Sequence, residues 1–413
     1  MAYRHGVYNV EQPTSMPTPQ EGRAAIQVII GTAPIHLAKD PAAAVNKPIL
    51  CSSYKEAVEA FGYSDDFDNF TLCQSIQASF GIFNVAPIIL INVLDPANTA
   101  HVTENSAESC AVSDKTAIYK KQYVLLDTLS VKSGQTDLVR GTDYSAEHDD
   151  DGNVVITLIS ETASAASSLS ISGKSLKPSG VTASDIVGAV NTSTGKETGL
   201  ETIRQVFPRL GKIPGTLLAP GWSHNAVVAA ALQAKTEAIN GVFNCVCLID
   251  IPSDSTGATV CTGVKTAKES LGITSPHAAA LWPMAQVGKK KYYMSAIFGA
   301  MMAYNDVLNG DVPCNPSNKA LPIDATVLAD GTEVLLDQQQ ADDYINAVGV
   351  ITAINAAGFR SWGNNTAAYP DTTDPKDRWF AVRRFFDWDG NEFVYKYTCL
   401  LYTSDAADDR ISV

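Results

Sequence analysis

The stretch that most constrains the fold runs from Thr216 to Pro252, where the residues read as strand, tight turn, helix and strand. Pro220-Gly221 marks a turn after a short apolar run, and Ser223 is placed to cap the helix that follows. Apolar residues then recur at helical spacing, and Gly241 lies where a left-handed cap would end the helix. Val242 to Ile251 is a nearly continuous apolar run, typical of a strand buried on both faces of a parallel sheet. The stretch therefore predicts a right-handed βαβ crossover at the centre of an α/β core.

Segments on both sides of this crossover repeat the alternation of strand and helix. Strands are predicted over Ala24–Gly31, Pro48–Cys51, Ile88–Val93, His277–Trp282 and Trp379–Asp387, the last followed by a hairpin at Asp389-Gly390 and a strand-like run Glu392–Thr398. Helices are predicted from a capping box of Ser53 and Glu56 to Phe61, and over Phe70–Phe80, Leu200–Leu210, Ser295–Leu308 and Gln338–Ala357. This alternation indicates an α/β (α+β) core with a mixed sheet and flanking helices.

The composition changes between residues 101 and 190, where Ser, Thr, Ala and Asp predominate. Stretches such as Tyr123–Asp127 and Val154–Ile159 alternate with period two, and Asp151-Gly152 is a strong turn signal. We interpret residues 101–190 as a small all-β domain inserted in an exposed loop of the core. Three successive acids, Asp149 to Asp151, raise the alternative of calcium. A solvated hairpin turn fits better, because the EF-hand spacing and its closing Glu are absent.

The first twenty residues contain Pro13, Pro17 and Pro19, which favour an extended arm over a helix. A short strand-like piece precedes them and consists of Gly6, Val7, Tyr8, Asn9 and Val10. An extended arm has unpaired backbone groups, so we predict that this piece adds a strand to the sheet edge of another subunit. The alternative is an ordinary frayed terminus.

The last fifteen residues, Cys399 to Val413, look foreign to the rest of the chain. Their sequence CLLYTSDAADD resembles the translation of a transposon-type sequencing adapter, a contaminant at the ends of metagenomic gene fragments. We therefore predict that the natural sequence departs from this one near Thr398. The alternative is a natural disordered tail.

The overall composition excludes several classes of protein. The 413 residues carry a formal net charge of −14, which disfavours non-specific nucleic-acid binding. No apolar run approaches the ~18 residues of a membrane-spanning helix, so no direct membrane insertion is expected. The eight cysteines include no CxxC pair, and Cys245 and Cys247 read as small buried residues of one strand.

Catalytic and cofactor motifs are weak throughout the sequence. Ser223, His224 and Asp250 suggest a hydrolase, but the G-x-S-x-G turn lacks its second glycine, and a base directly after the nucleophile is unusual. Gly195-Lys196 lacks the flanking residues of a phosphate-binding loop. We predict no enzyme activity, no cofactor and no metal site. Arg383 and Arg384 could pair with acids either in the core or across an interface.

Several motifs resemble those of one family of assembly proteins. They are His5-Gly6-Val7, SSYKEAVEAFG (residues 52–62), the strand end Ile91–Pro96, LLAPGWS (217–223), the loop Pro313–Asn318, ADDYINAVGVITAINAAGFRSWGNNT (341–366) and WFAVRRFFD (379–387). With them the chain resembles the tail sheath proteins of contractile phages and related contractile injection systems. The block 341–366 is the most specific part, and the match covers both halves of the core.

This resemblance implies a structural protein of the virion, assembled in the host cytoplasm. Such subunits stack as hexameric rings around an inner tube, exchange strands through terminal arms, and contract to drive the tube through an envelope during genome ejection. Tube, baseplate and tail terminator proteins are the implied partners. The implied organisation is an arm (1–20), a first core part (21–100), the inserted β domain (101–190), a second core part (191–398) and the foreign tail (399–413). The alternatives are a hydrolase using Ser223 and an adhesion protein displaying the β domain.

Overall fold

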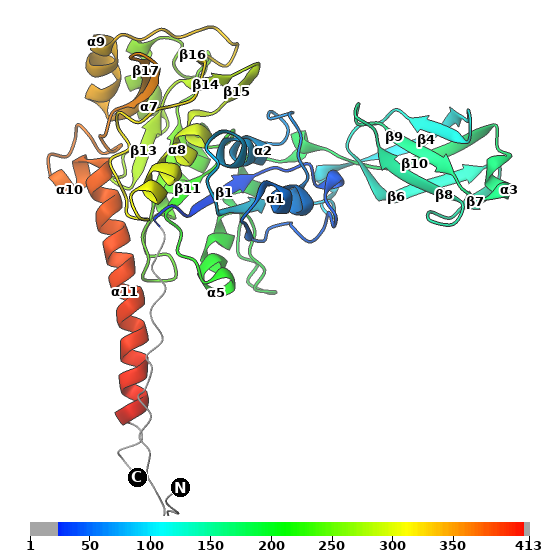
Figure 1. Ribbon diagram of the computed structural model, residues 1–413, viewed down its shortest axis with the longest axis horizontal. Coiled ribbons are helices and arrows are strands. Elements are labelled where there is room, and N and C mark those ends of the chain that lie inside the picture. The colour runs from blue at the N-terminus through cyan, green and yellow to red at the C-terminus, as the bar shows by residue number, and fades with distance from the viewer. Residues whose placement is uncertain (1–23, 409–413) are drawn as a thin grey trace, which may run out of the picture.

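The computed structural model describes residues 24–408, apart from the side chains of Thr162 and of residues 398–408. The predicted arm strand Gly6–Val10 therefore lies outside the described residues. Figure 1 shows a central α/β core from which two parts project in different directions. One is a β region of residues 102–176, and the other is the long helix α11 near the end of the chain.

An eight-stranded sheet organises the core, in the order β18-β17-β13-β12-β11-β1-β3-β2. The six central strands run parallel, and the edge strands β2 and β18 pair antiparallel to their neighbours. The strands are β1 (Gln27–Gly31), β2 (Ile49–Cys51), β3 (Ile88–Asn92), β11 (Thr216–Leu218), β12 (Val246–Asp250), β13 (Ala278–Leu281), β17 (Val350–Asn355) and β18 (Phe359–Trp362). The prediction of an α/β core with a mixed sheet is confirmed.

The crossover at the centre of the sequence forms as predicted, with β11 and β12 side by side and Thr216 opposite Val246. Its helix α6 (Ala226–Ala234) is shorter than expected. Asn225, rather than Ser223, caps this helix, because its side chain accepts a hydrogen bond from the backbone N–H of Val227 at 3.0 Å. The helix ends at Ala234, so the prediction that Gly241 caps it is wrong.

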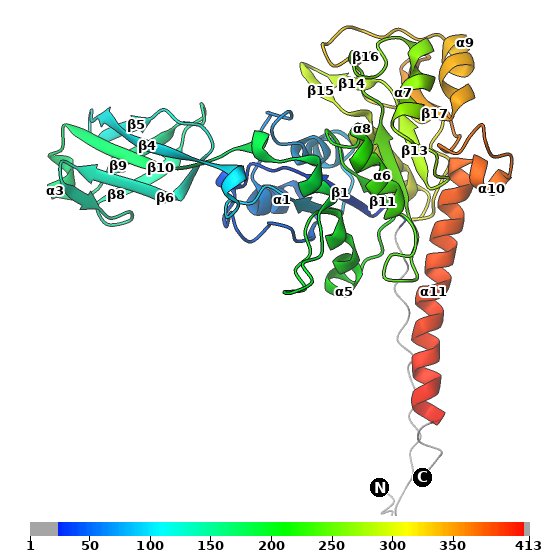
Figure 2. The same cartoon turned by 180° about the vertical axis from the view of Figure 1, so that it is seen from behind.

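Helices cover both faces of the large sheet (Figures 1 and 2). Helices α2 and α8 with the π-helical turn η2 pack on one face, and α6, α4 and the 3₁₀ segment η5 pack on the other. Gly299 lets α8 approach the sheet, because a Cβ at this position would lie 2.6 Å from a methyl of Leu218. The bounds are α1 (Tyr54–Phe61), α2 (Leu72–Ile76), η2 (Gln77–Ile82), α4 (Ala183–Val187), η5 (Gly199–Gln205), α5 (Val206–Leu210), α7 (Val264–Ser270), α8 (Met294–Leu308), α9 (Gln338–Gln340), α10 (Pro375–Arg378) and α11 (Phe380–Asp408).

Residues 102–176 form two antiparallel sheets that enclose their own apolar cluster, which includes Tyr119, Tyr144 and Ile156. One sheet has the order β4-β10-β6-β7 and the other β5-β9-β8. The strands are β4 (Val102–Ala111), β5 (Thr116–Tyr119), β6 (Val124–Ser133), β7 (Thr136–Leu138), β8 (Tyr144–His148), β9 (Val154–Leu158) and β10 (Ser168–Leu176), with a short helix α3 (Glu161–Ser164). A third small sheet, β15-β14-β16, lies in the core and consists of Lys290–Tyr292, Met284–Val287 and Ala325–Val327.

Two predicted elements have the wrong type. The second half of the predicted helix Gln338–Ala357 is strand β17, because Gly349 adopts a left-handed conformation (φ 71°) that ends the helical turns, and the β-branched run Val350–Thr352 follows. The predicted strand Trp379–Asp387, its hairpin and the run Glu392–Thr398 lie in helix α11, apart from Trp379, which is the C-cap of α10.

Candidate functional site

The residues that suggested a hydrolase meet in a buried cluster at the carboxyl ends of β11 and β12. The Ser223 hydroxyl donates to Asp250 Oδ2 at 2.9 Å and accepts the backbone N–H of Asp250 at 3.0 Å. Ser295 adds two hydrogen bonds to the same carboxylate, from its backbone N–H to Oδ1 at 2.8 Å and from its hydroxyl to Oδ2 at 2.5 Å. Ser223 and Ser295 have no exposed surface, and burial raises the pKa of Asp250 to about 6.

This cluster anchors a helix and lacks the relay of a hydrolase. Ser295 lies in the first turn of α8, so the Asp250 carboxylate occupies the N-terminal end of that helix, where its charge and hydrogen-bonding capacity are favoured. His224 stacks on Tyr293 with ring centroids 5.3 Å apart, and no hydrogen bond joins it to Ser223 among the described residues. Burial lowers the pKa of His224. The Ser223 hydroxyl is therefore bonded to a buried carboxylate and not to the histidine of a Ser-His-Asp relay.

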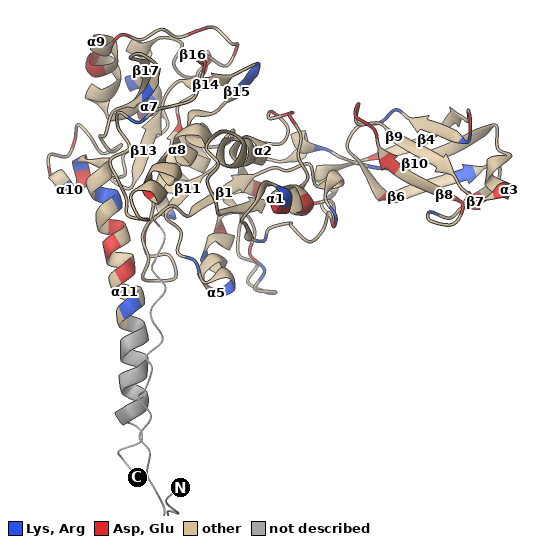
Figure 3. Cartoon of the chain, in the orientation of Figure 1, with Lys and Arg blue, Asp and Glu red and all other residues tan. Residues whose placement is uncertain are grey.

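The long helix α11 is held to the core by a stripe of polar residues, which we call the α11 seam: Arg384, Asp387 and Asn391. These positions have the spacing i, i+3, i+7 and face one side of the helix. Each of the three pairs with a residue of the core. Figure 3 shows that the turns of α11 nearest the core carry both positive and negative charges.

Arg384 forms the innermost pair of the seam. Its guanidinium binds the carboxylate of Asp306 on α8, and both side chains are almost completely buried. The same guanidinium donates to the carbonyl of Cys314 at 3.2 Å, and Asp306 also accepts the backbone N–H of Cys314 at 3.0 Å. The sequence left open whether Arg384 pairs with an acid in the core or across an interface. The structure shows that its partner is an acid of the core.

Two further contacts continue the seam along α11. His277 Nδ1 lies 2.9 Å from Asp387 Oδ2, and burial raises the pKa of Asp387 although His277 and Arg383 oppose that change. Asn391 makes a reciprocal pair with the backbone of Asn244, accepting its N–H at 2.9 Å and donating to its carbonyl at 2.6 Å. Arg383 pairs with Asp377 of α10.

The opposite side of α11 presents aromatic side chains to solvent. Phe393 is 66% exposed, and Phe385, Phe386 and Tyr397 are about half exposed. Rings on this face contact one another, with Phe393 stacked on Tyr397 at 5.5 Å between centroids. An exposed aromatic face of this extent is typical of a surface that contacts another protein.

A buried lysine fixes the segment that contains the most specific sequence motif. Lys268 of α7 donates from Nζ to the carbonyls of Val348 at 2.7 Å, Ala367 at 2.6 Å and Tyr369 at 3.0 Å. Burial lowers the pKa of Lys268 to about 8. The ammonium thus ties three points of residues 348–369 to α7.

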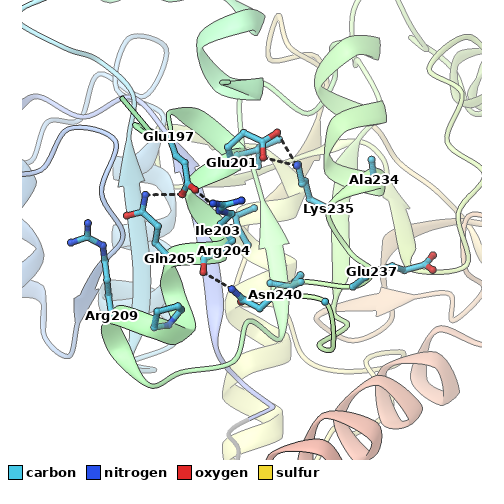
Figure 4. Close-up of a pocket in the computed structure, with 16 residues that line it drawn as sticks. Glu197, Glu201, Ile203, Arg204, Gln205, Arg209, Ala234, Lys235, Glu237 and Asn240 are labelled. Carbon is cyan, nitrogen blue, oxygen red and sulfur yellow. Dashed lines mark hydrogen bonds and ion pairs between the residues drawn. The ribbon is translucent and has the colours of Figure 1, made fainter. Parts of the chain in front are cut away.

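A polar groove with a volume of about 690 Å³ lies between η5 and the end of α6 (Figure 4). Four of its charges pair within the groove: Lys235 binds both carboxylate oxygens of Glu201 at 2.8 Å, and Arg204 binds the buried Glu197. Asn240 donates to the carbonyl of Arg204 at 2.8 Å. Arg209 and Glu237 also line the groove and form no ion pair with its other lining residues.

Metal binding and membrane insertion find no support in the described residues. Asp149 accepts from the backbone and side chain of Asn153, which is the behaviour of a turn residue between β8 and β9. No group of three or more His, Cys, Asp or Glu side chains between residues 24 and 397 is arranged to hold a metal ion. Within the part of the chain that the structure describes, no helix combines the length and apolarity needed to cross a membrane.

Sequence reasoning missed Asp306, Ser295 and Lys268. Asp306 had a signal, because a lone acid in the apolar helix Met294–Leu308 needs a buried partner. Ser295 and Lys268 had none, since their partners are distant in sequence.

Comparison with known proteins gives two sequence matches, while no family model matches the chain. A tail sheath protein of Burkholderia phage BcepMu is 27% identical over 386 residues, which are 90% of this chain and 76% of that protein. A putative prophage major tail sheath protein of Pseudomonas aeruginosa is 27% identical over 185 residues, 45% of this chain and 46% of that protein.

Solved structures with similar folds include sheath proteins. The helical sheath of the anti-feeding prophage in its contracted state has a TM-score of 0.49 and 13% identity, covering 97% of this chain and 77% of that one. The sheath tail protein of Desulfitobacterium hafniense has a TM-score of 0.49 and 12% identity, and the match covers 95% of this chain and 83% of that one. The sequence matches carry this comparison. They confirm the resemblance found in the motifs: the chain is similar to a phage tail sheath protein over 90% of its length.

Proposed function

We propose that this protein is the structural subunit of a contractile tail sheath, which polymerises around an inner tube and contracts to drive the tube through a cell envelope. The observation that carries the proposal is the 386-residue match to a phage tail sheath protein, which extends over both halves of the core. The subunit is then a virion component that is assembled in the host cytoplasm.

The proposed role requires assembly and no catalysis. The buried Ser223–Asp250–Ser295 cluster supports this view, because its serine has no exposed surface and its carboxylate is occupied by a helix end. Ester hydrolysis by the purified protein, lost in Ser223→Ala, would favour the hydrolase alternative instead. Cell or glycan binding by residues 101–190 would favour the adhesion alternative.

The proposed partners are further copies of this chain in stacked hexameric rings, the tube protein, and the baseplate and tail terminator proteins. The exposed aromatic face of α11 supports association with another protein, since Phe393 is 66% and Tyr397 50% exposed on a helix that projects from the core.

We further propose that the arm Gly6–Val10 adds a strand to the sheet of a neighbouring subunit. The two edges of the large sheet differ in their availability for such pairing. The outer side of β18 is covered, because Asn318 and Leu321 donate backbone hydrogen bonds to Ser361 and Phe359. Within residues 24–408, β2 forms backbone ladder bonds only to β3. An open edge of this kind supports strand addition.

Electron microscopy tests the assembly. The purified protein is mixed with its tube protein, and hollow, striated tubes are expected. Dispersed monomers at high concentration would contradict the proposal.

Variants of the arm test strand addition separately. Deleting Met1 to Pro13 should abolish tube formation without unfolding the core. Val7→Pro and Tyr8→Pro should have unequal effects, because only alternate N–H groups of a strand face the acceptor edge. Equal effects, or normal tubes from the deletion variant, would contradict strand addition.

A further inference from the structure

The β region of residues 102–176 contacts the core through a small aromatic cluster, which we call the His joint. Its members are His36 and Phe70 of the core and Tyr123 and His148 of the β region. His36 lies 5.3 Å from His148 and 5.5 Å from Tyr123 between ring centroids, in edge-to-face arrangements. Phe70 packs edge-to-face on Tyr123 at 5.1 Å. Aromatic pairs of this geometry stabilise an interface beyond the area they bury.

The two histidines are enclosed in the joint. Among the described residues, Nδ1 of His36 is buried and makes no hydrogen bond, and the ring nitrogens of His148 are buried beside the backbone of Val124 and Gly152. A neutral imidazole fits the site of His36, because a charged ring without a partner is costly to bury. Burial, with a smaller contribution from the neighbouring His148, lowers the pKa of His36 to about 3. Burial also lowers the pKa of His148, although the backbone of Val124 and Gly152 and the carboxylate of Asp149 oppose that change.

We propose that the His joint is an acid-labile contact, which holds the β region in one orientation on the core at neutral pH and releases it when His36 and His148 become protonated. The proposal does not depend on assembly into a sheath.

The charged groups around the joint leave this direction unchanged. Asp66 lies on the core side, and its carboxylate is occupied by the hydroxyl of Tyr123 at 2.7 Å. The backbone of Val124 and Gly152 and the carboxylate of Asp149, on the β8–β9 turn, favour protonation of His148, and burial and Arg140 oppose it, with burial the largest effect. Neither acid forms an ion pair with either histidine among the described side chains. Protonation of His36 therefore adds a charge without providing a partner for it, and the pKa of His148 remains lowered despite its backbone neighbours.

The direction of the pH effect follows from the linkage between protonation of the histidines and opening of the joint. Each histidine has a lower pKa in the closed joint than in the open one, so the contribution of the neutral ring is present above about pH 6.5 and is lost as the pH falls below it. With a closed-state pKa of about 3, His36 alone makes the open state about 30-fold more populated at pH 5 than at pH 8.

Hydrogen–deuterium exchange measured by mass spectrometry on the full chain tests the joint. After correction for intrinsic exchange rates, peptides spanning residues 33–38 and 121–125 should lose protection about 30-fold between pH 8 and pH 5. Peptides from β12 should keep theirs. In the variant His36→Phe/His148→Phe the rings remain aromatic but cannot be protonated, so the pH dependence should disappear.

Two controls distinguish the joint from a general effect of acid. His224→Phe removes another buried histidine, which stacks on Tyr293 in the core, and should leave the pH dependence of the joint peptides intact. Tyr123→Phe should raise exchange equally at both pH values. The proposal is overturned if the joint peptides of the wild type keep their protection at pH 5, if β12 loses protection together with them, or if the double variant retains the pH dependence. If the double variant does not fold, the single variants His36→Phe and His148→Phe show whether the pH dependence requires these histidines.

Discussion

Helices α8 and α11 are both long, and they are held in the protein by different forces. Most side chains of α8 are buried, among them Ile297, Phe298 and Met301, and the helix lies against the central sheet. Helix α11 instead docks through the polar α11 seam and leaves aromatic side chains in solvent. Apolar burial tolerates small changes of position, whereas the seam requires each charge and amide to find its own partner.

The largest expected effect comes from breaking the innermost pair of the seam. Arg384→Ala leaves the buried Asp306 carboxylate without its counter-charge, so we expect a loss of about 3–5 kcal/mol of unfolding free energy. Urea denaturation measures this loss. The double variant Arg384→Met/Asp306→Leu should recover most of it, and a loss below about 1 kcal/mol in Arg384→Ala would show that α11 is docked by other contacts.

A substitution in α8 probes the apolar side of the comparison. Ile297→Ala removes a fully buried side chain and leaves a cavity, so the unfolding free energy should fall by about 3 kcal/mol. Arg384 has one partner, Asp306, whose substitution should restore stability. Ile297 packs against several side chains, so no second substitution at a single position should restore the stability lost in Ile297→Ala. Rescue by a change at any one neighbouring residue would weaken the distinction between the two helices.

The pH dependence of stability tests the anchor of α8. The pKa of Asp250 is about 6 in the folded protein and about 4 in an unfolded chain, so the folded state binds the proton more strongly. The stability that this proton provides is present below about pH 4 and is lost as the pH rises through 6, a change of about 2–3 kcal/mol. Asp250→Asn should lack this component. The measurement is the difference between wild type and variant in denaturation midpoints from pH 4 to 7, and a constant difference would contradict the prediction.

A smaller effect is expected at the far end of the seam. Asn391→Ala removes both hydrogen bonds to the backbone of Asn244, and we expect a loss of about 1–2 kcal/mol. Asn391→Asp keeps the acceptor but places a carboxylate oxygen against the carbonyl of Asn244 in a buried position, so it should lose more. A smaller loss in Asn391→Asp than in Asn391→Ala, measured by thermal unfolding, would show that the bond donated to this carbonyl contributes little.

The smallest effect should come from the exposed face of α11. Phe393→Ser changes a side chain that is 66% exposed, so stability should change by less than about 0.5 kcal/mol. If the face contacts another protein, the same variant should still weaken assembly in the electron microscope. A large loss of stability would place Phe393 in the fold rather than in an interface.

The same contrast explains how much the sequence predicts. Strands such as β1, β3 and β12 are apolar along their length, and α8 has apolar residues at helical spacing, so local patterns are enough to find them. In α11 three inward positions are polar (Arg384, Asp387 and Asn391), although Phe380 is buried, and aromatics such as Phe393 lie outside. That inverted pattern reads as a strand, since aromatic residues favour strands.

The candidate site was predicted only where its parts are close in sequence or follow from connectivity. Ser223 and Asp250 meet because a βαβ crossover brings the ends of its two strands together, and the motif analysis found both. The pairing of Arg384 with Asp306, and of Lys268 with carbonyls about one hundred residues away, depends on the packing of distant segments. No local pattern contains that information.

The enclosed ammonium of Lys268 also makes this side chain a chemical reporter. An acylating reagent attacks only an unprotonated amine that it can reach, and a pKa of about 8 supplies the unprotonated form near neutrality, while burial denies access. Acylation of Lys268 must therefore wait until residues 348–369 separate from α7. Its rate, followed by mass spectrometry beside that of the exposed Lys55, measures how often this part of the subunit opens.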